Sequence, residues 1–303
     1  MNNPYKKMDK QLKETQKKYK NAQTEFTDTL QGVFDELNTL NSQVISTDTQ
    51  NRLKRKYERY RGFDLFVSSF IAYLVTKKRI TLEEITETEI LIAVDKLYKQ
   101  YDDINKSVFP EYVKDGYENC LEDIKKKRVR TDIEKIMNKQ LKSTANGSTY
   151  KSYMSGKIIS DMQQIKKQAM VTMNQNKMLN IKDFRKILER QNKQMLKTKD
   201  DKFSGFMEYQ AEVMYNAGYK QACEDYDVGE VMFIGISDNR QTEMCGSLDG
   251  QKFKVKGDNT FRRYFDSEVG VKEITVKGLE QGINLPPIND HFHYCRSYIE
   301  AIY

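Results

Sequence analysis

Apolar side chains recur at intervals of seven residues along the first forty positions, and this spacing constrains the fold more than any other feature. Further apolar side chains three or four residues later complete one stripe of a helix. The pattern predicts one amphipathic helix over residues 4–43, and its repeat from Tyr5 to Leu40 spans about 55 Å at ~1.5 Å per residue. The repeat consists of Tyr5, Leu12, Tyr19, Phe26, Val33 and Leu40, and Met8, Ala22, Leu30 and Leu37 fill the turns between them.

A helix of this length exceeds what a compact domain needs, so part of it should pack on another helix or another subunit. One interpretation is a docking or oligomerisation arm, and the other is a helix that folds back into a bundle of its own chain. The aromatic residues at the first heptad position would make a poor isolated dimer. Both interpretations stay open on the sequence alone.

Helical periodicity continues to about residue 200. Ser46, Thr47 and Asp48 are candidate caps for the helix that follows them. Thr81 and Glu84 have the spacing of a capping box, and Pro110 is expected to end the helix that this box begins. The expected helices cover residues 49–77, 81–105, 111–127, 131–141, 149–179 and 181–200.

The last hundred residues differ from this helical region. A helix is expected over residues 203–226, and the short apolar run at 231–236, bounded by turn residues, predicts a buried strand. Strands are also expected at 252–256, 273–276 and 297–302. The fold class is therefore mainly α with a C-terminal α+β module, in which a helical region over residues 1–200 precedes a small mixed domain with a short β-sheet over residues 201–303.

The longest apolar stretch, Phe63 to Val75, is interrupted by Asp64 and two serines. It is shorter than the ~20 residues that cross a bilayer, so it predicts a buried core helix and no membrane anchor. No basic segment followed by an apolar one opens the chain, so we expect no secretory signal and a cytoplasmic site of synthesis. The four cysteines, at positions 120, 223, 245 and 295, are widely spaced, which favours reduced thiols or a metal site over disulfides.

Positive charge is concentrated in the helical region. The whole chain carries a net charge of +7, of which residues 1–228 contribute +9 and residues 229–303 contribute −2. A basic helical surface could bind nucleic acid by neutralising phosphates. Because acidic residues are interspersed almost throughout, a solvated surface of mixed charge is the alternative.

The densest basic cluster follows a predicted helix at residues 124–130. It could contact packaged DNA through phosphates alone, without reading sequence. Alternatively, its cations face the negative end of the helix dipole. The candidate residues for DNA contact are Lys125, Lys126, Lys127, Arg128 and Arg130.

An ordered series of motifs occupies the last quarter of the chain, and its information lies in order and spacing. The series resembles the signature of the phage head morphogenesis family, the minor head proteins of tailed phages similar to protein F of phage Mu. Phe292, flanked by two histidines, stands where that family has a histidine, and Glu208-Tyr209-Gln210 stands where it has Arg-Thr-Glu. The matching residues are Asp238, Arg240, Cys245, Leu248, Asp249, Gly250, Pro286, Pro287, His291, His293, Cys295 and Arg296.

The resemblance implies a capsid-associated protein without enzymatic activity. Proteins of this family bind the phage portal protein inside the procapsid, are retained in the virion, and act in head morphogenesis, DNA packaging or DNA ejection. The implied partners are the portal protein, with scaffold or major capsid protein and packaged DNA as further candidates. The implied location is the phage head near the portal, after assembly in the host cytoplasm.

Two thiols and both histidines of the chain lie within its last 59 residues. Cys245, His291, His293 and Cys295 are candidate ligands for a structural Zn²⁺, which takes four such ligands tetrahedrally. A His-x-His-x-Cys segment on a strand points its three side chains to one face. A buried cysteine with two surface histidines would give the same pattern, so the zinc site is one of two interpretations.

Asp238, Arg240 and Asp249 occupy the loop after the first predicted strand. A carboxylate here could activate water beside a metal. The structural alternative is that Asp238 caps a turn, Arg240 pairs with a carboxylate and Gly250 supplies a positive φ. Arg296 is expected to hold the same carboxylates in place.

Two other classes of function remain as alternatives to a minor head protein. Modules of this kind also occur in toxin proteins, so a metal-dependent nuclease or toxin-type effector is one alternative. A plain DNA-binding protein is the other. The sequence contains no phosphate-binding glycine loop, no G-x-S-x-G motif and no H-E-x-x-H motif, so it gives no support to the common hydrolase and nucleotide-binding classes.

Overall fold

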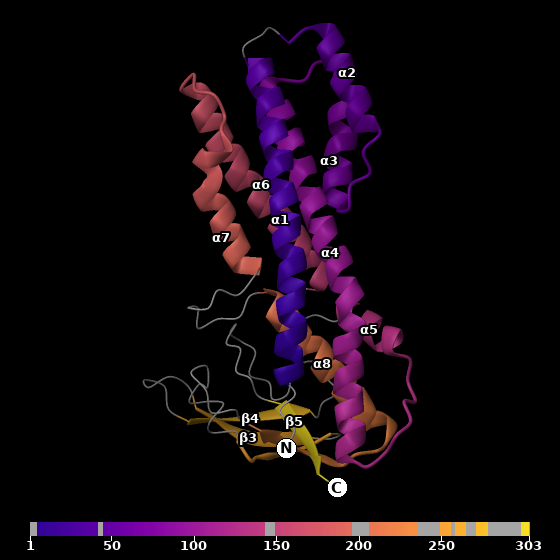
Figure 1. Ribbon diagram of the computed structural model, residues 1–303. Coiled ribbons are helices and arrows are strands. Elements are labelled where there is room, and N and C mark those ends of the chain that lie inside the picture. The colour runs from indigo at the N-terminus through magenta and orange to yellow at the C-terminus, as the bar shows by residue number, and fades with distance from the viewer. Residues whose placement is uncertain are drawn as a thin grey trace. The chain divides into compact units, whose positions relative to one another are not determined.

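The computed structural model describes residues 5–41, 45–142, 149–195, 206–234, 249–255, 258–264, 271–277 and 298–302 (Figure 1). Within these residues the chain is mainly helical, with a small three-stranded antiparallel sheet near the C-terminus. The predicted fold class is confirmed. No helix among the described residues is long and apolar enough to cross a membrane.

Two compact units make up the chain. Unit 1 contains residues 1–15, 105–150 and 195–303, and unit 2 contains residues 16–104 and 151–194. The predicted domain boundary at residue 200 lies outside the described residues. Unit 1 joins the C-terminal module to two segments of the preceding helical region, so its core is assembled from distant parts of the sequence.

Helix α1, Tyr5–Asn41, is the predicted long amphipathic helix. In unit 2 the Tyr19 ring stacks on Tyr101 at 4.3 Å between centroids, and the Phe34 ring lies 4.4 Å from Phe184. Phe34, rather than the heptad residue Val33, is buried, because a straight helix with 3.6 residues per turn drifts away from a seven-residue repeat. The apolar stripe of α1 is therefore packed within its own chain.

The single helix expected over residues 49–77 is instead two helices, α2 at Thr47–Glu58 and α3 at Leu65–Thr76. The predicted cap Ser46 begins α2, since its hydroxyl accepts the Thr49 N–H at 3.2 Å. Asp64 caps α3 by accepting the Phe66 N–H at 2.8 Å. The break between the helices is held by Asp95, whose carboxylate accepts the backbone N–H groups of residues 63 and 64 at 2.7 and 3.0 Å.

Helix α4, Leu82–Asp123, continues through Pro110, so the predicted break there is wrong. A proline within a helix lacks one N–H donor and normally kinks or ends the helix. Here Phe109, Tyr112 and Val113 are buried on either side of the proline, and their packing keeps the helix continuous. The predicted capping box at the start of α4 is confirmed, because Thr81 and Glu84 each accept the backbone N–H of the other, at 3.2 and 2.8 Å.

Three further helical elements complete unit 2, namely α6 at Tyr150–Asn174, the 3-10 turn η1 at Ile181–Phe184 and α7 at Arg185–Met195. The Tyr98 hydroxyl donates to the buried Asp161 carboxylate at 2.7 Å and joins α4 to α6. The Asn38 amide exchanges two hydrogen bonds with the backbone of Leu179, at 2.9 and 2.7 Å. These buried and half-buried polar contacts fix the register of the helices, since each buried polar group must keep its partner.

Unit 1 is built around the crossing of α4 with α8, Phe206–Asp225. Helix α5, Ile133–Lys142, packs against α8 and contributes Ile136 and Met137 to the core of the unit. Met8 and Leu12, from the first turns of α1, belong to the same core. This core extends to the sheet through Val231, Phe233, Phe253 and Ile299.

The sheet has the order β2-β1-β5, with both pairs antiparallel. Strands β1 at Glu230–Ile234, β2 at Lys252–Lys254 and β5 at Tyr298–Ile302 correspond to three of the predicted strands. The fourth prediction falls within β4, Val271–Lys277, which pairs with β3 at Asp258–Tyr264. Strand β3 was not predicted, because its polar composition gives no apolar alternation.

Candidate functional site

The C-terminal signature is described at only two of its candidate positions, Asp249 and Gly250, which lie in the turn before β2. The Gly250 N–H donates to the carbonyl of Phe233 at 2.8 Å, and Gly250 has a φ of +75°. This is the left-handed conformation that glycine tolerates best, so Gly250 serves the turn as the sequence suggested. The remaining signature residues lie outside the described part of the chain, namely Asp238, Arg240, Cys245, Leu248, Pro286, Pro287, His291, His293, Cys295 and Arg296.

The zinc site stays a prediction for the same reason. All four candidate ligands, Cys245, His291, His293 and Cys295, are outside the described residues. Among the residues that the structure does describe, no group of three or more His, Cys, Asp and Glu side chains is arranged to hold a metal ion. Metal analysis of protein purified without an affinity tag, compared with Cys295→Ser, tests the prediction directly.

The basic cluster at residues 124–130 forms the connection from α4 to α5. Helix α4 ends in a Schellman arrangement, in which the N–H of Lys126 donates to the Leu121 carbonyl at 2.8 Å and the N–H of Lys125 donates to Glu122 at 3.1 Å. Lys125 occupies the left-handed position of this motif with a φ of 54°. Residues 125–130 are all exposed, as a nucleic-acid contact would require.

Arg130 differs from the other cations of this cluster because it is held against the end of α8. Its guanidinium lies 4.0 Å from the centroid of the Tyr226 ring and donates to the backbone carbonyl of Asp225. The Tyr226 hydroxyl in turn donates to the carbonyl of Arg128 at 2.5 Å. Arg130 therefore anchors the loop, whereas none of the ion pairs in the described part of the chain involves Lys125, Lys126 or Lys127.

A carboxylate at the end of α8 also anchors this loop through hydrogen bonds. Asp225 accepts hydrogen bonds from the hydroxyls of Tyr117 and Thr131, the latter at 2.7 Å. The Tyr117 oxygen also accepts the N–H of Arg130 at 3.1 Å. Burial, followed by the hydrogen bond to Asp225, raises the pKa of Tyr117 to about 12, so this hydroxyl remains a donor at neutral pH. The loop thus presents its lysines on a fixed backbone.

Two of the four cysteines meet in the core of unit 1. The sulfur atoms of Cys120 on α4 and Cys223 on α8 are 3.5 Å apart, and both side chains are fully buried. Both thiols are free. The hydrogen bond between them and their burial raise the pKa of Cys223 well above its ordinary value. The wide spacing of the cysteines favoured reduced thiols or a metal site and gave no signal for this pair, because 103 residues separate its members.

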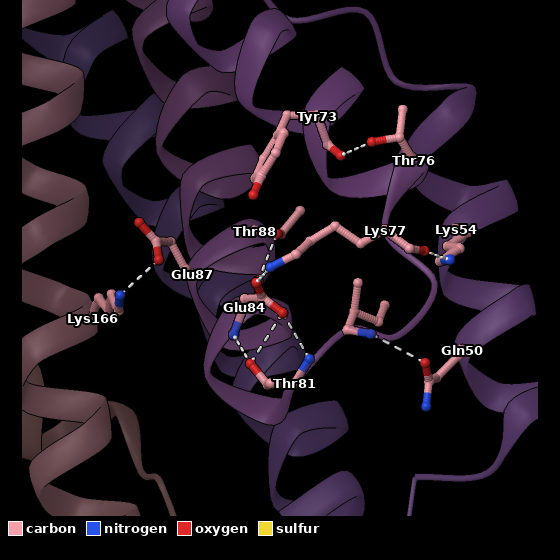
Figure 2. Close-up of polar contacts among 11 residues, drawn as sticks. Gln50, Lys54, Tyr73, Thr76, Lys77, Thr81, Glu84, Glu87, Thr88 and Lys166 are labelled. Carbon is pink, nitrogen blue, oxygen red and sulfur yellow. Dashed lines mark hydrogen bonds and ion pairs between the residues drawn. The ribbon is translucent and has the colours of Figure 1, made fainter.

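The corner between α3 and α4 gathers a polar network in unit 2, shown in Figure 2. The ammonium of Lys77 forms an ion pair with Glu84 and lies 5.5 Å from the centroid of the Tyr73 ring. Lys54, on α2, donates to the backbone carbonyls of Lys77 and Lys78. The network joins Lys54 of α2 to the end of α3 and the beginning of α4.

Glu84 is the centre of this corner because it is both a helix-cap residue and an ion-pair partner (Figure 2). The hydrogen bond from Lys77 and then the backbone N–H of Thr81 lower the pKa of Glu84 below its ordinary value. Nearby, Lys166 on α6 pairs with Glu87 at 2.6 Å and Glu83 at 3.1 Å. These contacts neutralise the carboxylates at the start of α4.

Sequence reasoning also missed a concentration of positive charge around α3. Residues 52–79 carry nine lysines and arginines against the two acids Glu58 and Asp64, which is a net charge of +7, equal to that of the whole chain. The cations fall in two separate groups in the sequence, before and after the apolar residues of α3. In the fold, Arg59 and Arg61 precede α3 and Lys77, Lys78 and Arg79 follow it, whereas the other four cations lie on α2.

Comparison with known proteins returned no relative. No protein-family model, no curated protein and no solved structure matches the chain.

Proposed function

We propose that this chain is a phage minor head protein that associates with the portal inside the procapsid and acts in head morphogenesis. The observation that carries the proposal is the ordered series of residues from Asp238 to Arg296, which resembles the signature of the phage head morphogenesis family. The resemblance lies in the order and spacing of the series and not in any single motif.

The architecture supports this proposal in two ways. A helical bundle offers long surfaces for protein contact, and a small α+β module follows it in the chain, as the resemblance leads one to expect. The one signature position described in detail, Gly250, has a conformational role in a β-turn. A role in architecture fits a protein that positions other proteins and needs no catalytic turnover.

The proposed mechanism is physical. The C-terminal module anchors the protein at its site in the head, and the helices contribute protein contacts and positive charge near DNA. Lys125, Lys126 and Lys127 are exposed on an anchored loop, which supports a non-specific contact with packaged DNA. Such a contact would use phosphate charge alone, so we expect little sequence preference.

Co-purification with the portal protein encoded in the same genome tests the proposal. The full chain is expected to remain bound to the portal protein, and substitution of the signature residue Arg240→Ala is expected to weaken binding. Lys13→Ala, at an exposed position of α1, serves as the control and should leave binding unchanged. Binding to DNA without binding to the portal protein would contradict the proposal, as would metal-dependent DNA cleavage that Asp238→Ala abolishes.

A further inference from the structure

Helix α3 is apolar on the side that faces away from the core as well as on the side that faces it. Its twelve residues, Leu65–Thr76, include no charged side chain. Val67, Ile71 and Leu74 are buried in unit 2, as the sequence predicted for a core helix. Leu65 and Tyr73 nevertheless remain 72% and 61% exposed, so the predicted core helix is buried on one side only.

The exposed residues of α3 form one continuous surface. At about 100° per residue, they fall within an arc of about 120° opposite the buried residues. Small side chains lie between large ones on this arc, an arrangement that leaves a groove for the ridge of another helix. We call this surface the α3 face, and it consists of Leu65, Phe66, Ser69, Ala72, Tyr73 and Thr76.

Cations border the α3 face at both ends. Arg59 and Arg61 precede the helix, Lys78 and Arg79 follow it, and all four are exposed. In the described part of the chain none of these four forms an ion pair with a carboxylate. The neighbouring cations differ in this respect, because Lys56 pairs with Glu36 and Glu89 and Lys77 pairs with Glu84.

We propose that the α3 face binds an amphipathic helix of a partner protein, one with an apolar side and with carboxylates near both ends. Twelve residues of helix span about 18 Å, so the carboxylates of the partner should be separated by a similar distance. The apolar side chains would bury Leu65, Phe66 and Tyr73, and the carboxylates would pair with the arginines and lysines at the two ends. The proposal does not depend on the head function proposed above.

The charge distribution favours a different protein over a second copy of this chain. In a symmetric dimer the same surface meets itself, so two α3 faces would bring their cationic ends together. Like charges brought together at an interface oppose association. An acidic helix satisfies both the apolar surface and the charges around it.

The apolar character of α3 also favours a protein over DNA or a lipid surface. A phosphate backbone is bound by cations and gains nothing from an exposed uncharged helix face. Helices that lie on membranes carry lysines and arginines along their own polar side, whereas α3 has none. DNA and lipid are therefore outcomes that the experiment must distinguish.

A designed peptide can serve as the probe, with fluorescence anisotropy as the measurement. The peptide is an 18-residue helix with leucines along one side and pairs of glutamates about twelve residues apart. A peptide of the same composition in scrambled order is the control ligand. We expect the full chain to bind the first peptide and not the second, and we expect the double variant Leu65→Glu/Tyr73→Glu to weaken binding at least about tenfold.

Matched variants separate the α3 face from general effects of charge and folding. Met178→Glu changes another exposed apolar side chain, 75% exposed, and should leave binding unchanged. Arg59→Glu with Arg79→Glu should weaken binding and remove most of its salt dependence. Circular dichroism and thermal unfolding confirm that each variant is folded.

Several results would overturn the proposal. The absence of peptide binding is one, and binding that Leu65→Glu/Tyr73→Glu leaves unchanged is another. Binding of duplex DNA, or of vesicles of phosphatidylglycerol and phosphatidylcholine, in place of the peptide would also overturn it if substitutions in the α3 face weaken that binding. A dimer that dissociates when Leu65 is replaced by Glu would show that a second copy is the occupant.

Discussion

Gly116 on α4 and Gly218 on α8 each face the backbone of the opposite helix. A Cβ atom on Gly116 would lie 1.9 Å from the carbonyl oxygen of Tyr215, and one on Gly218 would lie 1.9 Å from the carbonyl oxygen of Val113. The two helices can approach so closely only because neither residue has a side chain. This reciprocal contact is the centre of unit 1 and holds the core on which the small sheet rests.

Replacement of either glycine should therefore destabilise the protein. We expect Gly116→Ala and Gly218→Ala each to lower the free energy of unfolding by about 2–3 kcal/mol, because the added methyl group forces the helices apart. Urea denaturation followed by circular dichroism provides the measurement. Gly156→Ala is the matched control, since no atom lies within 4 Å of its added Cβ and it should instead stabilise α6 by about 0.5–1 kcal/mol. Equal effects at all three positions would contradict the close crossing.

The buried cysteine pair gives a second prediction about the same crossing. Cys120 and Cys223 are fully buried, and the raised pKa of Cys223 keeps its thiol protonated. Only the thiolate reacts readily with alkylating reagents. We expect iodoacetamide at pH 8 to leave both residues unmodified in the folded protein and to modify both in urea, as measured by peptide mass spectrometry. Gly116→Ala should accelerate the reaction, and rapid labelling of the native protein would show that the pair is accessible.

The capping box at the start of α4 predicts a pH dependence. The pKa of Glu84 is lowered in the folded state, so its contribution to stability is present above the unfolded pKa, about 4.3, and is lost as the pH falls through the folded pKa. We expect Glu84→Gln to lower stability at pH 7 by about 1 kcal/mol or less, since the ion pair is partly exposed, and to have little effect at pH 3. Denaturant titrations at both pH values test this. A loss of stability of the same size at pH 3 would mean that the carboxylate charge does not cause the loss at pH 7.

The loop from α4 to α5 predicts how DNA binding should depend on salt. The triple variant Lys125→Ala/Lys126→Ala/Lys127→Ala removes three exposed cations from the anchored loop. If each contacts one phosphate, the slope of log K against log salt should decrease by about 2.7. Filter binding or anisotropy with duplex DNA measures the slope. The control variant Lys13→Ala/Lys17→Ala/Lys20→Ala removes the same charge from exposed positions of α1 and should change the slope less. Equal changes of slope in the two variants would argue against a specific role of the loop.

Much of this fold could be predicted from local patterns. The heptad stripe of α1, the cap at Ser46 and the capping box at Thr81 all act within one or two turns of helix, so the sequence contains the whole of each signal. The strand at 230–234 was likewise visible as an apolar run between turns. The errors lie where tertiary contacts override a local rule. Pro110 continues a helix because its neighbours are buried, and the break before Asp64 is fixed by a carboxylate 31 residues away.

The candidate sites were harder to predict because they depend on residues that are distant in sequence. Arg130 was correctly placed in a basic cluster, but its contact with Tyr226, which directly follows α8, has no local signal. The pairing of Cys120 with Cys223 and the reciprocal glycines have none either. The uncharged run in α3 predicted a buried helix, and only the fold reveals that one side of this helix remains exposed between two groups of cations.

Mass spectrometry of purified phage particles tests the central proposal most directly. Particles released from cells that carry this gene would be separated on a density gradient and their proteins quantified against the portal protein. We expect this chain to co-sediment with intact heads in a small number of copies, comparable to the portal protein, and to be protected from added protease until the heads are opened. Particles that contain portal and major capsid protein but lack this chain, with the chain left behind in the lysate, would contradict its assignment as a minor head protein.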